Sequence, residues 1–511
     1  MQHGVCPDYA MRKDILHLYK GLPPVAKASL WFMVCTMLQK CLSLVTTPIF
    51  TRIMDAEQYG YFSTYLSLLT ILPVLLTLNF DTGAYANGIT KLDNENDVDQ
   101  LGTSLLALSF IITAAFGVIA FFAREFLADW LALPASILLL LVLEILFLPP
   151  LRFWMLKQRF AYKYVSVVAV ILGMLVVNNA LGILVVLAFP ATQAVMRVLA
   201  ITVVQVLVGI PLYGLYLKKS GLKNLTRFWK YGLRLNLPLV PHSLSIHVMA
   251  SSDKVMINAM IGAVQAGIYG VANSVGHLMT AFKLSLVEAL RPWVYEKLKS
   301  RDFAEIRSVC QVLFIANVVI SFLMVGLAPE IVAVLAPQKY HQAIYVIPPV
   351  AASGFFSFVY NTCSLVEMYY ERTKSVMVAS VVSAALNVGL NFAFIPKFGF
   401  LAAGYTTLVS CAFLSAMHFF IVCRIQREEM DNARVIGKGP TLLLAGLTIA
   451  VMIVFTVLYA HPALRWCAVV ALASICWMGR RKFMDIHRAL RSAKKRQTVV
   501  VAGKQGEGGT P

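Results

Sequence analysis

The sequence predicts an all-α integral membrane protein with about 14 transmembrane helices. Of its 511 residues, 59% are hydrophobic and only 14% are charged, and the mean hydropathy is +0.74. A soluble domain is about 45–50% apolar and about 25% charged, so the composition excludes a soluble enzyme, a secreted disulfide scaffold and a disordered chain. The sequence has no alternating pattern of the kind that a β-barrel shows. The spans are therefore expected to be helices, in which the backbone groups form their hydrogen bonds within the segment.

Apolar runs long enough to cross a bilayer, which takes about 20 residues, recur along the chain. They lie at residues 28–50, 60–79, 101–122, 134–151, 164–189, 192–217, 236–261, 267–290, 308–328, 343–366, 375–395, 400–423, 440–460 and 463–479. Similar short turns precede the second and eighth runs, which open at Gly60 and Gly267. We therefore expect two six-helix lobes that form a parallel pseudo-repeat around a central cavity, followed by two C-terminal helices.

The distribution of basic residues predicts the orientation of these spans. Lys and Arg number 44 against 25 Asp and Glu, and most of them fall in the termini and in the loops on the same side. The opposite side holds only a few, at the edges of spans: Arg52, Arg124, Lys339, Lys397 and Arg465. The positive-inside rule predicts a multi-pass protein of the cell (inner or plasma) membrane with both termini cytoplasmic. It also explains the net charge of +19 without nucleic acid as a partner.

The longest well-charged connection within the helical array, residues 218–235, is expected to separate the lobes. The predicted domains are a cytoplasmic N-terminal segment (1–27), an N-lobe (28–217), this inter-lobe linker (218–235), a C-lobe (236–424), two last spans (425–479) and a basic cytoplasmic tail (480–511). The tail has apolar residues at helical spacing and is expected to lie on the anionic inner leaflet.

Catalytic and metal-binding signatures are missing from the sequence. Of the nine cysteines, eight lie within or beside apolar runs, without a CxxC pair, as expected for small buried hydrophobic residues rather than disulfides or metal ligands. There is no Walker motif and no loop long enough for a catalytic domain. We therefore expect neither an enzyme nor a resident cofactor or metal.

Polar side chains inside the spans mark the candidate site. A stripe on one helix face of span 236–261 consists of Ser243, His247, Ser251, Lys254 and Asn258. Lys40 and Arg197 are further cations within spans, and each such charge costs about 2.5–3.5 kcal/mol near mid-span. We expect the cations to line a water-filled, electropositive cavity. The alternative is that these residues hold the helices together through hydrogen bonds and ion pairs.

The complete set of candidates follows from these stripes. Residues expected in the substrate cavity are Lys40, Arg197, His247, Lys254, Asn258, Asn273 and His277. Carboxylates expected to bind a coupling ion or to form ion pairs are Asp81, Asp253 and Glu288. Asp253 points about 100° away from Lys254 around the helix, so the two are not expected to pair. Lys283 lies nearer the cytoplasmic end of its span and is expected to snorkel to the surface.

Six segments carry a resemblance to a known family. They are Pro48–Tyr65, Asp253–Asn258, Gly267–Ala272, Arg291–Leu298, Asn387–Asn391 and Phe394–Gly404. They resemble the O-antigen (Wzx-like) flippases of the polysaccharide biosynthesis family, within the multidrug/oligosaccharidyl-lipid/polysaccharide (MOP) exporter superfamily. The resemblance implies two six-helix lobes around a cavity that opens alternately to each side. It also implies a polyprenyl-pyrophosphate-linked oligosaccharide as cargo, moved from the inner to the outer leaflet for surface polysaccharide export.

The residues agree with such a cargo, because a basic cavity suits a pyrophosphate and polar stripes suit sugar hydroxyls. Membrane lipids and other glycan-assembly proteins are the further partners considered. Three alternatives stay open: a multidrug (MATE-like) exporter of cations, a flippase for a lipid-linked peptidoglycan precursor, and a scaffold that transports nothing. The sequence does not specify the glycan, or whether H⁺ or Na⁺ is exchanged during transport.

Overall fold

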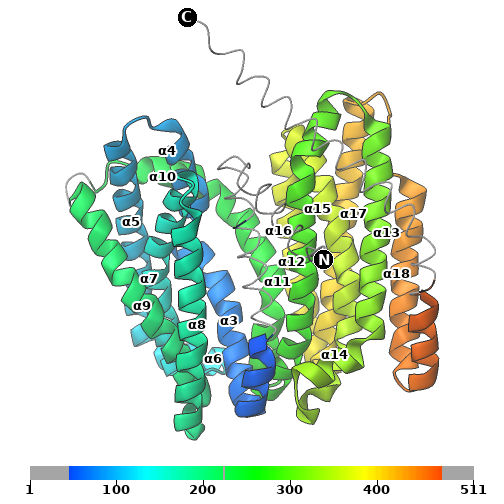
Figure 1. Cartoon of the computed structure of the whole chain (residues 1–511), viewed down its shortest axis with the longest axis horizontal. Coiled ribbons are helices and arrows are strands. Elements are labelled where there is room, and N and C mark those ends of the chain that lie inside the picture. Colours follow the sequence, from blue (N-terminus) through cyan, green and yellow to red (C-terminus); the bar gives the residue numbers. More distant parts are fainter. Residues whose placement is uncertain (1–30, 32–44, 222–224, 473, 475–511) are drawn as a thin grey trace, which may run out of the picture. The chain divides into compact units, whose positions relative to one another are not determined.

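The computed structural model describes residues 31, 45–221, 225–472 and 474, except for eight side chains of one helix, α12. Within these residues the chain forms helices and turns and no strand (Figure 1). Residue contacts divide the chain into two compact units, Met1–His247 and Val248–Pro511. The division falls inside a helix, whereas the sequence predicts a linker at 218–235, so the predicted domain boundaries stay predictions.

The first unit is built from long helices joined by short turns. Its elements are α3 (Ala56–Leu76), η1 (Asp81–Tyr85), α4 (Ala86–Lys91), α5 (Glu95–Phe122), α6 (Arg124–Leu131), α7 (Ala135–Phe160), α8 (Tyr164–Ala188), η2 (Pro190–Thr192), α9 (Gln193–Ser220), α10 (Trp229–Asn236) and η3 (Leu237–Leu239). Helix α7 packs against α5 and α9, and α8 packs against α9. The core at one end of this unit includes the stacked rings of Tyr85 and Phe153, whose centroids are 4.5 Å apart.

The second unit begins within α11 (Val240–Met260). It continues through α12 (Ala263–Lys299), α13 (Phe303–Gly326), α14 (Ala328–Leu335), η4 (Gln338–Tyr345), α15 (Ile347–Tyr369), α16 (Thr373–Phe398), α17 (Leu401–Glu428) and α18 (Lys438–Leu458). Helix α15 packs against α12, α13, α17 and α18. Its central position is explained by an aromatic core in which Phe314 of α13 makes edge-to-face contacts with Phe355 and Phe358.

Most of the predicted spans are present as helices. Nine helices of the described part are long and apolar enough to cross a membrane, or ten if the bent pair Gln338–Tyr345 and Ile347–Tyr369 forms one span. They match the second to sixth and the ninth to thirteenth predicted runs. Helices α11 and α12 occupy the seventh and eighth runs but are not among the nine. The first run lies mostly outside the described residues, so the total of 14 stays a prediction.

The predicted inter-lobe linker contains a short helix, α10, that packs on the first unit. Trp229 donates its indole N–H to the carbonyl of Ser104 at 3.0 Å. The Asn236 side-chain amide donates to the carbonyls of Leu78 and Asn79, at 2.8 Å each, and its oxygen accepts from the backbone N–H of Ala84. Because apolar side chains on α10 join the same core, this segment is a packed element rather than a free connection.

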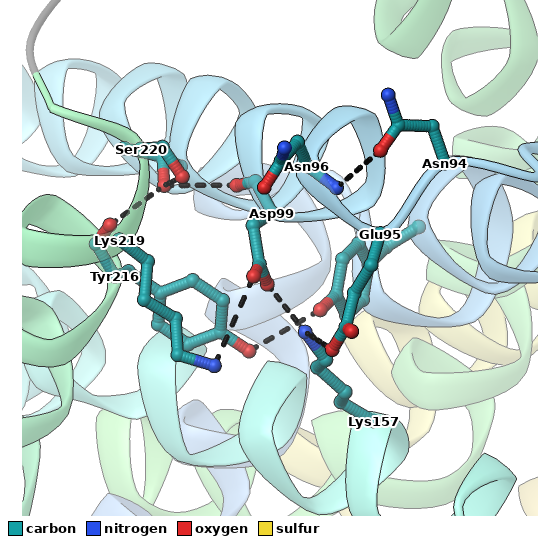
Figure 2. A network of polar contacts seen from close by, with 10 residues as sticks. Asn94, Glu95, Asn96, Asp99, Lys157, Tyr216, Lys219 and Ser220 are labelled. Carbon is teal, nitrogen blue, oxygen red and sulfur yellow. Dashed lines mark hydrogen bonds and ion pairs between the residues drawn. The ribbon is translucent and has the colours of Figure 1, made fainter.

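A polar network ties three helix ends of the first unit together (Figure 2). Asp99, near the start of α5, is buried and forms ion pairs with Lys157 of α7 and, at 3.8 Å, with Lys219 of α9. Lys157 also lies 3.4 Å from the exposed carboxylate of Glu95. The Thr103 hydroxyl forms hydrogen bonds with the carbonyl of Tyr216 and with the hydroxyl of Ser220. A buried carboxylate shared by two lysines thus fastens α5, α7 and α9 to one another.

We expect Asp99→Asn to destabilise the first unit by about 1.5–3 kcal/mol, the range for a hydrogen bond to a charged group. The substitution removes the charge that both lysines share, while Glu95 retains only an exposed contact with Lys157. The measurement is the thermal midpoint of the purified full-length protein. Glu125→Gln is the matched control, because Glu125 is largely exposed in its pair with Arg124 and such pairs contribute about 0–1 kcal/mol. Equal midpoints for the two variants would contradict a structural role for Asp99.

Candidate functional site

Asp253 lies at the centre of a buried polar cluster in the second unit. Its carboxylate accepts hydrogen bonds from Tyr269 of α12 at 2.6 Å, Thr407 of α17 at 2.7 Å and the Asn391 amide of α16 at 2.7 Å. Asp253 itself belongs to α11 and is 4% exposed. Four helices therefore contribute one side chain each to a site around a single carboxylate, and we call these four residues the Asp253 cluster.

A second layer of neutral polar side chains holds the Asp253 cluster in place. The Asn387 amide donates to the Thr407 hydroxyl at 3.2 Å, and its oxygen accepts from Ser252 at 3.3 Å. The Thr406 hydroxyl donates to the Asn391 oxygen. Asn387 and Asn391 lie one helical turn apart on α16, which brings both onto the same buried face.

The chemistry of the Asp253 cluster suits a small hard cation or a proton. Its side chains offer carboxylate, hydroxyl and amide oxygens, the ligand atoms that hard cations prefer. Tyr269 and Thr407 have rotatable hydroxyls, so their oxygens can accept or turn toward a cation. Among the described residues no group of three or more His, Cys, Asp or Glu is placed to hold a metal ion.

Lys254, next to this cluster on α11, is a buried cation that lacks a hydrogen-bonded or ion-paired partner in the described part of the chain. Its side chain is 7% exposed, and no described residue forms a hydrogen bond or an ion pair with it. The neighbouring carboxylate of Asp253 acts on it electrostatically but is hydrogen-bonded elsewhere, as its position around the helix predicts. A buried charge without such a partner is costly, and an anionic ligand would offset that cost.

Lys283 of α12 does not snorkel, contrary to the expectation from its position. Its side chain is buried and its ammonium donates to the carbonyl of Gly354 in α15 at 3.2 Å. Lys283 thus has a backbone partner, whereas Lys254 has none among the residues that the structure describes.

Arg197 of α9 is held inside the first unit by backbone and side-chain oxygens. Its guanidinium donates to the carbonyl of Asn178 and to the side-chain oxygen of Asn179 in α8. It also lies over the ring of Phe50, with its central carbon 4.2 Å from the ring centroid, a favourable cation–π geometry. A side chain at Gly182 would collide with it. These contacts hold the guanidinium inside the first unit, although its buried Nε has no hydrogen-bond partner among the described residues. The contact of Arg197 with a substrate stays a prediction.

The remaining predicted residues are spread over both units. His247 and Asn273 are half-buried on α11 and α12, Asn258 is buried on α11, and Asp81 is half-buried at the start of η1. Lys40 lies outside the described residues, as do the side chains of His277 and Glu288. Asp253, Lys254 and Asn258 are all buried on α11, and the roles of all the candidates stay predictions.

Two buried carboxylates were missed by the sequence reasoning. Glu144, in the middle of α7, accepts a hydrogen bond from Tyr65 of α3. Glu367 of α15 pairs with His418 of α17 at 2.8 Å, and both side chains are almost completely buried. A carboxylate within an apolar run, such as Glu144 within residues 134–151, is itself a signal of a functional or structural polar site. Neither Glu144 nor Glu367 belongs to the polar stripes that mark the candidate site, so the pattern of polar residues did not include them.

Comparison with known proteins identifies the family. The model of the family described as "Polysaccharide biosynthesis protein" matches residues 25–298, which is more than half of the chain. An uncharacterized membrane protein of Haemophilus influenzae is 22% identical over 285 residues, covering 53% of this chain and 66% of the relative. The chain thus covers slightly less than two thirds of that relative's length.

Solved structures show the same fold. The lipid II flippase MurJ, in an inward closed conformation, aligns with a TM-score of 0.63 at 13% identity, over 88% of this chain and 99% of its own. An inward-facing multidrug resistance MATE family transporter of the MOP superfamily aligns with a TM-score of 0.57 at 13% identity, over 78% and 96%. A mutant of the Vibrio cholerae MATE transporter VcmN gives 0.53 at 12% identity, over 80% and 97%. This chain is a member of the polysaccharide biosynthesis protein family, and it has the fold of the membrane transporters of the MOP superfamily.

Proposed function

We propose that this protein flips a lipid-pyrophosphate-linked oligosaccharide from the inner to the outer leaflet of the cell membrane, by alternating access, for surface polysaccharide export. The observation that carries the proposal is the buried Lys254 ammonium, which has no hydrogen bond or ion pair with a described residue. A protein that transports an anion needs a cationic side chain that is not already paired with another group of the protein, so that it can bind the cargo. Lysine is a flexible point charge, which suits a phosphate group that moves through the protein.

The Asp253 cluster is proposed as the site at which a monovalent cation, Na⁺ or H⁺, is coupled to transport. Occupation by a cation would weaken the hydrogen bonds from Tyr269, Thr407 and Asn391, because their donors face the negative charge. The cluster joins four helices, so such a rearrangement would change how those helices pack. Coupling of this kind requires only that the ion bind one conformation more tightly than the other.

The membrane potential also favours the proposed direction. A pyrophosphate with about two negative charges moves outward across a potential that is negative inside. At roughly 2.3 kcal/mol per charge per 100 mV, this contributes about 5 kcal/mol per cycle. Fixed positive charge that moves with the cargo would reduce the contribution. If the Lys254 charge moves with the cargo, the membrane potential therefore contributes less free energy to export. A cation bound at the Asp253 cluster would supply part of the difference.

Two other cargoes remain as alternatives within the same fold. A multidrug exporter of cations would need a carboxylate open to a large organic cation, whereas Asp253 is 4% exposed and closely surrounded by Tyr269, Thr407 and Asn391. A lipid-linked peptidoglycan precursor presents a similar anionic lipid to the protein, and one neighbour in structure is titled a lipid II flippase. The basic residue Lys254 fits both lipid-linked cargoes, so an experiment in cells has to separate them.

Deletion of the gene is expected to abolish a surface polysaccharide while its lipid-linked units accumulate on the cytoplasmic face. The measurement is extraction of lipid-linked oligosaccharides together with immunodetection of the surface glycan, with re-expression of the full-length chain as the control. Normal surface glycan with altered drug sensitivity would overturn the proposal in favour of the multidrug exporter. Normal surface glycan with accumulated peptidoglycan precursor would overturn it in favour of the other lipid flippase.

A further inference from the structure

A groove of about 530 Å³ lies in the second unit between α15, α17 and α18. Its lining is mainly apolar and includes Phe355, Phe356, Val359, Phe419, Phe420 and Leu442. Phe420 and Leu442 are 72% and 69% exposed, which is ordinary for a surface in contact with lipid chains. The volume falls within the range of about 300–1,000 Å³ that is typical of ligand sites. Because all three helices are among those long and apolar enough to cross a membrane, counting α15 with its bent partner, the groove lies at the level of the bilayer.

One end of this groove is basic. Arg424 and Arg427 lie at the end of α17, and Lys438 is the first residue of α18. The lining includes these three cations and no carboxylate. Arg424 is paired with Glu428, which is shared with Arg372. Arg427 and Lys438 are exposed and form no hydrogen bond or ion pair with a described residue, so their charge is available to a ligand.

We propose that this groove binds one anionic phospholipid, with its phosphate between Arg427 and Lys438 and an acyl chain along the aromatic lining. The groove is complementary to both parts of such a lipid: its apolar lining suits an acyl chain, and its basic end suits a phosphate. Arginine binds phosphate with a planar fork and lysine with a point charge. The basic C-terminal tail of this chain is excluded as the occupant by its own charge, because residues 480–496 would be repelled by the same three cations. The proposal is independent of the cargo and concerns a lipid of the surrounding membrane.

The test is lipid binding by the purified, delipidated full-length protein, measured by native mass spectrometry with phosphatidylglycerol and with phosphatidylcholine of the same acyl chains. One phosphatidylglycerol is expected to bind at least about tenfold more tightly than phosphatidylcholine. Each basic residue near an anionic lipid contributes about a fivefold increase in affinity, so the double variant Arg427→Gln/Lys438→Gln should lose about 25-fold. Both positions are exposed, so this variant is expected to fold.

Two further variants make the result specific. Lys374→Gln is the matched control, because Lys374 is an exposed lysine of the same unit that does not line the groove, and it should bind phosphatidylglycerol like the parent. Ala416→Phe places an aromatic ring from an exposed position of the lining into the groove and should lower the affinity for both lipids while the charges remain. The proposal is overturned by equal affinity for the two lipids, by parental binding in the double variant, or by an equal loss in Lys374→Gln. Co-purification of a polyprenyl phosphate or of a second copy of this chain, lost in Ala416→Phe, would also overturn it.

Discussion

Replacing Lys254 by glutamine should reduce transport about 10- to 100-fold while leaving the amount of folded protein close to that of the parent. A hydrogen bond to a charged group contributes about 1.5–3 kcal/mol, and each 1.4 kcal/mol corresponds to a factor of ten. The ammonium is buried and forms no hydrogen bond or ion pair with a described residue, so its removal takes away a desolvated charge and no partner. The measurement is the initial rate of flipping in vesicles, divided by the amount of protein incorporated.

Lys283→Gln is the control for a buried lysine without a role in transport. Lys283 donates to the carbonyl of Gly354, so its replacement should lower the thermal midpoint and change transport little. Lys254→Arg should be tolerated only in part, because the larger planar group cannot follow a phosphate in the same space. Parental transport by Lys254→Gln would show that this lysine does not touch the cargo. Loss of the protein from the membrane, restored by a second change at Asp253, would show a packing role instead.

Replacing Asp253 by asparagine should remove the dependence of transport on the coupling cation and lower the rate at least about tenfold. Asparagine has nearly the same shape, but it carries no charge and presents one amide donor toward Tyr269, Thr407 and Asn391. A monovalent cation then loses the single formal charge of its site. The rate is measured in vesicles over a range of Na⁺ concentration and, separately, of pH, and the parent should respond to one of the two.

Thr407→Val separates coupling from structure in this cluster. It removes one hydrogen-bond donor at 2.7 Å and leaves the carboxylate of Asp253 in place. We expect this variant to keep the cation dependence with a shifted midpoint, whereas Asp253→Asn should lose it. If Asp253→Asn responds to the cation as the parent does, the carboxylate is a structural group and coupling takes place elsewhere. If neither protein responds to Na⁺ or to pH, the proposed coupling is wrong.

The helices were predictable because hydropathy alone determines them in a membrane protein. The predicted run 101–122 lies within α5, and the run 164–189 nearly coincides with α8. Helix ends were less predictable. Helix α12 continues to Lys299, nine residues beyond the predicted run 267–290, and passes through Pro292. Neither the end of the apolar stretch nor the proline marks the end of this helix. Helix α10 was not predicted, because its apolar side chains alternate with charged residues and do not form a long apolar run.

The candidate site was predictable only in part. The stripe on α11 predicted that Lys254 and Asn258 share one helix face, because a period of 3.6 brings them together, and both residues are buried. The partners of Asp253 lie on α12, α16 and α17, and no pattern in one sequence says which faces of distant helices meet. The same limit explains why Glu367 and His418, on α15 and α17, were not paired in advance. The partner of Lys283 could not be predicted either, because it is the backbone carbonyl of Gly354, and a pattern of polar side chains does not include backbone groups.

The most direct test of the proposed function is flipping by the purified full-length protein in vesicles that contain a polyprenyl-pyrophosphate-linked oligosaccharide. Cargo in the outer leaflet is cleaved by an added glycosidase, so the cleaved fraction reports how much has crossed the membrane. We expect the cargo to become fully accessible with the parent protein, and far more slowly with Lys254→Gln or with empty vesicles. The same accessibility in empty vesicles and in vesicles with the parent protein would contradict transport of this cargo.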